Sequence, residues 1–90
     1  MLPIKTGLSD SYPNPFNPTT SINYGLSNDV YVEIMVYDAS GRLVDELVNQ
    51  NQTAGYHSIT WNASNQASGM YFAKMIAGDI VQTQKLILLK

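Results

Sequence analysis

The sequence predicts an all-β fold, a small immunoglobulin-like antiparallel β-sandwich of six to seven strands. Three observations support this fold class. Apolar and polar residues alternate in several short segments, and turn-forming residues recur about every eight to twelve residues. The 90 residues are 44% hydrophobic, which is enough for one small core. The chain has no cysteine, so it lacks the Cys pair of antibody domains, and its stability depends on apolar packing.

Residues 1–11 show no hydrophobic period, and we expect a linker or lead segment there. A proline-rich stretch follows. Because proline fixes φ near −65° and has no N–H donor, this stretch can be neither a helix nor a central strand. We expect a stiff, extended ribbon that marks the start of a folded domain over residues 12–90. Its residues are Tyr12, Pro13, Asn14, Pro15, Phe16, Asn17 and Pro18, with Tyr12 and Phe16 as aromatic anchors.

The first strand pattern begins at Thr20, where Ile22, Tyr24 and Leu26 alternate with small polar residues. Residues 27–29 have the composition of a turn. The strongest strand pattern covers residues 30–37, with one face made of Val30, Val32, Ile34 and Val36.

A turn over residues 38–41 leads into residues 42–48. Apolar residues in this segment also fit a short helical stripe, but hairpin pairing with the preceding strand favours a strand. Residues 49–55 are polar, and we expect a loop there.

Residues 56–62 alternate again, with His57, Ile59 and Trp61 on one face. A tryptophan amid apolar neighbours is expected to be buried at the centre of such a sandwich. Further strands are predicted over residues 70–77 and 80–89, on either side of a tight turn.

Composition and residue pattern favour no enzymatic chemistry. There is one histidine, and its position on an apolar strand face indicates a packed ring rather than a catalytic base. No segment resembles a calcium loop or a glycine-rich phosphate site, so we predict no enzyme, no cofactor and no metal site. The net charge of −2 argues against nucleic-acid binding. No apolar run approaches the ~18–20 residues that span a bilayer.

The C-terminus ends in four consecutive apolar residues between two lysines: Lys85, Leu86, Ile87, Leu88, Leu89 and Lys90. A continuous apolar run is typical of a strand that is covered on both faces, which favours a central position in a sheet. An exposed strand end can also bind another protein by strand addition or through its carboxylate. The two interpretations are compatible, because a strand can pack in the domain while its tip stays accessible.

Taken together, these motifs resemble the type A C-terminal sorting domain of the Bacteroidetes-type type IX secretion system. The resemblance extends from Tyr12 to Lys90. It rests on the proline-rich stretch through Thr20, Val36-Tyr37-Asp38 with Gly41-Arg42, Ala54-Gly55-Tyr56-His57, Trp61-Asn62, Ser68-Gly69-Met70-Tyr71-Phe72 and Lys85–Lys90. Residues 55–71 are also similar to the immunoglobulin-like module of flagellar hook-capping proteins.

The resemblance implies a secretion signal. An N-terminal passenger on the parent chain would be exported to the periplasm, recognised by the outer-membrane type IX translocon and passed to the cell surface or beyond. A surface sortase would remove the domain by a cut upstream of residue 12. Residues 85–90 would carry the translocon recognition, supported by the proline-rich stretch and by Gly69 and Tyr71. A weak homodimer through sheet edges is a further expectation.

Two alternatives remain open. One is a non-catalytic accessory module that binds carbohydrate or mediates adhesion, with an exposed aromatic platform drawn from Tyr12, Tyr31, Tyr37, Tyr56, Tyr71 and Trp61. The other is a hook-capping-like assembly module that self-associates through its sheet edges. Buried rings would count against the first alternative.

Overall fold

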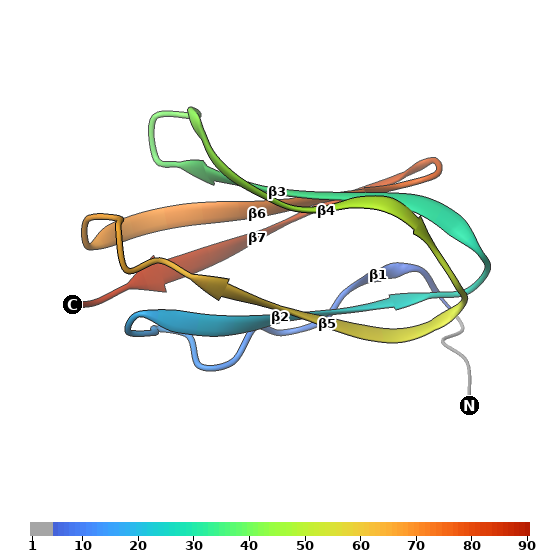
Figure 1. The fold of residues 1–90 in the computed structure, drawn as a ribbon, viewed down its shortest axis with the longest axis horizontal. Helices are drawn as coiled ribbons and strands as arrows, with labels where there is room; N and C mark the ends of the chain where they lie inside the picture. The colour runs from blue at the N-terminus through green and yellow to red at the C-terminus, as the bar shows by residue number, and fades with distance from the viewer. Residues whose placement is uncertain (1–4) are drawn as a thin grey trace.

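The computed structural model describes residues 5–90, and this part of the chain contains seven β-strands and no helix (Figure 1). Among these residues, none lies in a helix that is long and apolar enough to cross a membrane. The strands are β1 (Gly7–Leu8), β2 (Thr19–Leu26), β3 (Val30–Asp38), β4 (Leu43–Gln52), β5 (Gly55–Asn62), β6 (Gly69–Ala77) and β7 (Ile80–Leu88).

The strands form two sheets that face each other as a sandwich (Figure 1). One sheet has the strand order β1-β2-β5, and the other has the order β4-β3-β6-β7. Every pairing between neighbouring strands is antiparallel. The predicted all-β antiparallel sandwich is therefore confirmed.

The core lies between the sheets, where alternate residues of each strand point inward. Trp61 is 1% exposed, which confirms its predicted burial. Its ring lies 5.6 Å from that of Phe16 and 5.3 Å from that of Tyr71, measured between centroids. The indole N–H donates to Asp45 Oδ2 at 3.1 Å, so the buried donor has a partner.

The segment that follows the 38–41 turn is a strand, and it extends further than the sequence indicated. β4 pairs with β3 along its length, so the strand interpretation is confirmed over the helical one. The expected loop over residues 49–55 was wrong, because β4 continues to Gln52 and β5 begins at Gly55. β4 is an edge strand, and its polar residues can remain in a strand because one face and one edge meet water.

The expected central position of the last strand was also wrong. β7 lies at the edge of the four-stranded sheet and pairs by its main-chain ladder with β6. Leu86 and Leu88 are fully buried and face the core, whereas Leu89 is 57% exposed. Alternate residues of the apolar run therefore pack in the core. The outer edge of β7, where a further strand would pair, is contacted by a different part of the chain.

Part of the expected lead segment belongs to the sandwich. Gly7 and Leu8 of β1 pair with Gly25 and Tyr24 of β2, and the Ser9 N–H donates to the Asn23 carbonyl at 2.8 Å. Two strand residues are too few to show an alternating pattern, so the sequence offered no signal for β1. Residues 1–4 of the lead lie outside the described residues, and a domain boundary between residues 11 and 12 stays a prediction.

Candidate functional site

The proline-rich stretch lies along the outer edge of β7. Phe16 and Leu88 form a parallel bridge, in which the Phe16 N–H donates to the Ile87 carbonyl at 2.9 Å. The Leu89 N–H donates in turn to the Phe16 carbonyl at 3.0 Å. Prolines are tolerated here because a segment at a sheet edge needs few N–H donors. Phe16, which follows Pro15, supplies the donor and places its ring in the core, where it is 2% exposed.

The Asn14 side chain makes the next two contacts along the same edge. Its Nδ2 donates to the Lys85 carbonyl at 3.0 Å, and its Oδ1 accepts from the Ile87 N–H at 3.0 Å. A side-chain amide has the same donor and acceptor groups as a peptide unit. Asn14 therefore replaces one residue of a missing neighbouring strand.

Two glutamines of β7 continue the contact towards the start of that strand. Gln82 Oε1 accepts from the Leu8 N–H at 2.7 Å, and Gln84 Nε2 donates to the Ser9 carbonyl at 2.7 Å. Ser11 Oγ also bonds to Gln84 Oε1. Residues 8–16, here called the edge segment, thus accompany β7 from Gln82 to Leu89. A strand edge that would otherwise offer unpaired backbone groups is largely occupied.

The end of the chain is held against the loop that precedes β6. The Lys90 N–H donates to Ser68 Oγ at 2.9 Å, and Lys90 Nζ donates to the Ser64 carbonyl at 2.6 Å. Tyr71 stabilises the same loop, because its hydroxyl donates to the Ala67 carbonyl at 2.6 Å. Gly69, with φ of +155°, begins β6 in a backbone conformation that favours glycine.

The predicted site residues are therefore brought together at one end of the sandwich. Gly69 pairs with Leu88 and Tyr71 pairs with Leu86, while Asn14 and Phe16 contact the other side of the same strand. The Pro13 carbonyl accepts from Thr20 Oγ1 at 2.7 Å, and the Pro18 carbonyl accepts from the Ala63 N–H at 2.8 Å. Pro15 and Asn17 are exposed. Residues that sequence reasoning missed are Ser11, Ser64, Ser68, Gln82 and Gln84, whose polar character alone gives no signal of a long-range contact.

The aromatic residues do not form one platform. Phe16, Tyr24, Trp61 and Tyr71 are buried. The exposed rings are Tyr12 before β2, Tyr31 on β3 of the four-stranded sheet and Tyr56 on β5 of the three-stranded sheet. Exposed rings on separate sheets cannot line a single flat sugar-binding surface, so the arrangement does not support the carbohydrate-binding alternative.

His57 is packed, as its position in the sequence predicted. Its ring stacks on Tyr24 with the centroids 5.3 Å apart, and Nε2 lies 2.8 Å from the Thr53 carbonyl oxygen. Within residues 5–90, no group of three or more His, Cys, Asp or Glu side chains is placed to hold a metal ion.

The Asp38-to-Arg42 motif forms a hydrogen-bonded turn. Asp38 Oδ1 accepts from the Ser40 hydroxyl at 2.6 Å and from the Ser40 and Arg42 N–H groups at 3.0 Å. Arg42 Nε lies 3.3 Å from Asp38 Oδ2. These donors, the Ser40 hydroxyl foremost, hold the pKa of Asp38 below its ordinary value. The motif thus closes the β3–β4 hairpin and needs no ligand to explain it.

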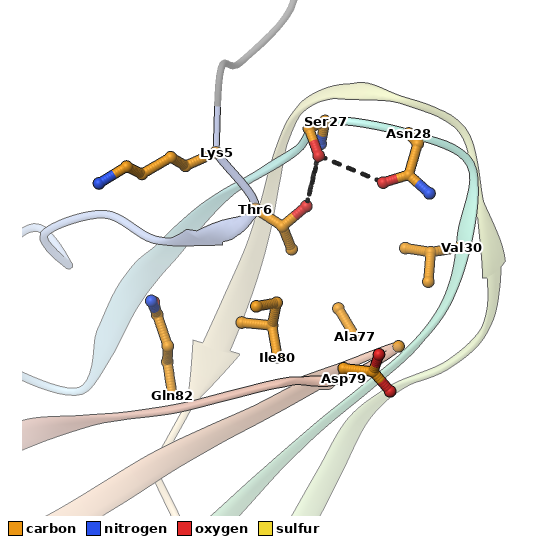
Figure 2. Close-up of a pocket in the computed structure, with 10 residues that line it drawn as sticks. Lys5, Thr6, Ser27, Asn28, Val30, Ala77, Asp79, Ile80 and Gln82 are labelled. Carbon is orange, nitrogen blue, oxygen red and sulfur yellow. Dashed lines mark hydrogen bonds between the residues drawn. The ribbon is translucent and has the colours of Figure 1, made fainter.

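A pocket lies at the opposite end of the sandwich from Lys90, between the chain's first described residues and the β2–β3 and β6–β7 turns. Figure 2 shows Ser27 linked to Thr6 and Asn28 at its rim, by hydrogen bonds of 3.1 and 3.2 Å. The charged side chains of Lys5 and Asp79 lie on opposite sides of it, and Ile80 is among its apolar lining residues. None of the predicted site residues lines this pocket.

Comparison with known proteins adds one finding. The family described as the secretion system C-terminal sorting domain has a model that matches residues 10–89. The matched range contains most of the edge segment and all of β7. Nothing matches the chain among curated proteins or among solved structures.

Proposed function

Because the chain belongs to the family of secretion system C-terminal sorting domains, we propose that its edge segment and residues 85–90 form the surface that the type IX translocon recognises. The domain is a C-terminal sorting signal for that system, and its parent is a secreted protein with a passenger on the N-terminal side. The observation that carries the proposal is the pair of hydrogen bonds that the Asn14 side chain makes, one donated to the Lys85 carbonyl and one accepted from the Ile87 N–H.

These contacts give the tail a defined shape before any partner binds. A flexible peptide would lose conformational freedom on binding, at a cost of about 0.5–1.5 kcal/mol for each side chain that becomes fixed. Leu89 and Lys90 remain exposed although their backbone N–H groups are bonded. A partner could therefore contact these side chains without unfolding β7.

The arrangement also separates the tail from the passenger. Lys90 lies at one end of the 36 Å long axis, and the first described residues lie at the other, beside the β6–β7 turn (Figure 1). The translocon could bind the tail while a folded passenger occupies the far end. A sortase would then act upstream of residue 12, and the sorting domain itself would have no catalytic role.

The transit of the parent protein through the periplasm is part of the same proposal.

A weak homodimer through sheet edges, which the sequence also predicts, has two long strand edges to use, those of β4 and β5, because the edge strand β1 has only two residues. The edge of β7 is already contacted by Asn14 and Phe16, so strand addition there would require the edge segment to leave.

The test uses the full chain fused behind a periplasm-directed fluorescent reporter, in a host that has the type IX machinery. We expect the wild-type fusion to be found outside the cell. We expect the fusion that carries Leu89→Asp and Lys90→Glu to be retained in the periplasm. Both side chains are exposed, so the change should leave the core intact. Deletion of residues 85–90 is unsuitable, because it removes the buried Leu86 and Leu88 as well.

The matched control is Thr60→Lys, an exposed residue on the outer face of the three-stranded sheet, which should be exported normally. All fusions are first shown to have a cooperative melting transition at the wild-type temperature. Normal export of the folded Leu89→Asp, Lys90→Glu fusion would contradict recognition through the tail.

A further inference from the structure

The outer faces of the two sheets differ sharply in chemistry. The three-stranded sheet presents small polar residues outward, such as Ser21, Ser58 and Thr60. The four-stranded sheet presents large apolar and aromatic side chains, four of which are exposed: Tyr31 at 46%, Leu43 at 51%, Met70 at 43% and Val81 at 57%. The outward set of this apolar face consists of Tyr31, Met35, Tyr37, Leu43, Met70, Phe72, Ile76, Val81 and Ile87. A contiguous apolar face on one side of a small domain marks an interaction surface.

The charges on the apolar face are divided between its two halves. Glu46 on β4 and Glu33 on β3 lie on one half, and Lys74 on β6 and Lys85 on β7 lie on the other. Within residues 5–90, the only ion pair is that of Arg42 with Asp38, so these four groups have no ionic partner among the described residues. An acidic half beside a basic half is complementary to itself when one copy is reversed relative to the other.

We propose that the apolar face binds the same face of a second copy of this chain, about a two-fold axis that runs parallel to the strands between β3 and β6. This interface includes Lys85 and Ile87, which also belong to the proposed translocon surface, whereas Leu89 and Lys90 lie outside it. The strand register fixes which residues meet. Glu46, Met35, Lys74 and Thr83 form one row across the sheet. The two-fold axis reverses that row, which places Lys74 of one copy over Met35 of the other.

Lys74 then lies about one strand spacing, ~4.8 Å, to the side of Glu46 of the other copy, within reach of its flexible side chain. In the next row, Phe72 of one copy lies over Tyr37 of the other, which puts aromatic rings at the centre of the interface. A two-fold axis perpendicular to the strands would instead place β4 over β4, so that the acidic half of one copy would face the acidic half of the other. The charge pattern therefore selects the parallel axis.

The geometry of sheet packing also suits a second copy. Two sheets pack face to face about 10 Å apart with their strands nearly aligned, as the proposed axis requires.

Sedimentation equilibrium of the full chain, from micromolar to millimolar concentration, tests the proposal. We expect a reversible dimer that Lys74→Glu or Glu46→Lys each weakens by about tenfold or more, because each places like charges together. The double variant Lys74→Glu, Glu46→Lys should recover the wild-type dissociation constant within a few-fold. Thr60→Lys on the opposite face should leave it unchanged.

Cross-linking places the interface independently, since the chain has no native cysteine. Met35→Cys lies near the proposed axis, and a bismaleimide of about 10 Å should join two copies through it, whereas Thr60→Cys should stay monomeric. A monomer at all concentrations would overturn the proposal, as would a dimer that is insensitive to the charge reversals. If Lys74→Glu blocks secretion of a chain that is monomeric throughout, the apolar face belongs to another protein and the proposal is wrong.

Discussion

Asn14 and Ile87 are 73 positions apart in the sequence, and the side chain of the first accepts the backbone N–H of the second at 3.0 Å. The same amide donates to the Lys85 carbonyl. The two motifs that most resemble a sorting domain, one at each end of the domain, therefore form a single structural unit. The shape of the C-terminal tail depends on the proline-rich stretch, so substitutions in that stretch should alter the conformation of the tail.

Replacing Asn14 with Ala should loosen the end of β7 without unfolding the domain. Two hydrogen bonds at an accessible site are lost, which should lower the free energy of unfolding by about 1–2 kcal/mol. Hydrogen exchange of the Ile87 amide should accelerate more than that of Met75 in the core. Asn65→Ala, in the exposed loop before β6, is the matched control and should change neither quantity. Unaltered exchange at Ile87 would contradict the role assigned to Asn14.

Replacing Phe16 with Ala should destabilise the whole domain. The ring is buried against Trp61, and removal of a buried aromatic side chain costs about 3–5 kcal/mol. Such a loss is a large part of the 5–15 kcal/mol that is typical of small domains. Urea denaturation, followed by Trp61 fluorescence, should show a large decrease in midpoint for Phe16→Ala and a smaller one for Phe16→Leu. A change below 1 kcal/mol for Phe16→Ala would mean that the ring is not in the core.

Replacing Asp45 with Ala should leave the buried indole N–H of Trp61 without its acceptor. An unsatisfied buried donor costs about 1–3 kcal/mol, so the free energy of unfolding should fall by that amount. Asp45→Asn keeps an acceptor oxygen and should lose less. Thermal melting together with the Trp61 emission wavelength checks both variants. Equal losses for Asp45→Ala and Asp45→Asn would show that charge, rather than the hydrogen bond, accounts for the effect.

Ionisation of the Tyr24 hydroxyl should lower the free energy of unfolding of the domain at alkaline pH. Burial raises the pKa of its hydroxyl above the usual value of 10.0, and the hydrogen bond to Gln52 offsets this in part. The folded state then keeps the proton when the unfolded state loses it. Stability is full below about pH 10 and falls as the pH rises from there through the folded-state pKa.

Urea titrations at several values from about pH 9 to about pH 11 measure this dependence. Tyr24→Phe has no ionisable group at the site, so its free energy of unfolding should decrease less steeply above pH 10. Identical slopes for the wild type and Tyr24→Phe would contradict a raised pKa at Tyr24. Tyr56→Phe is a useful control, because its ring is exposed.

Much of the fold could be predicted from local pattern. The alternation at Ile22, Tyr24 and Leu26 identified β2 and its buried face, and the same reasoning placed Trp61 in the core. The limits of β4 were missed because residues 49–52 are polar, and a polar strand at a sheet edge has the composition of a loop. The motifs of the candidate site were recognised individually, but the contacts of Leu8 and Ser9 with Gln82 and Gln84 had no signal in the sequence.

The sequence by itself determined where the strands lie and which side of most strands is buried, because side chains alternate between two faces with a period of two. It also determined family membership, through short motifs in a fixed order. Only the tertiary structure decided that β7 is an edge strand and that residues 8–16 cover that edge. Strand order depends on contacts between residues far apart in the chain, and an edge strand has the same period as a central one.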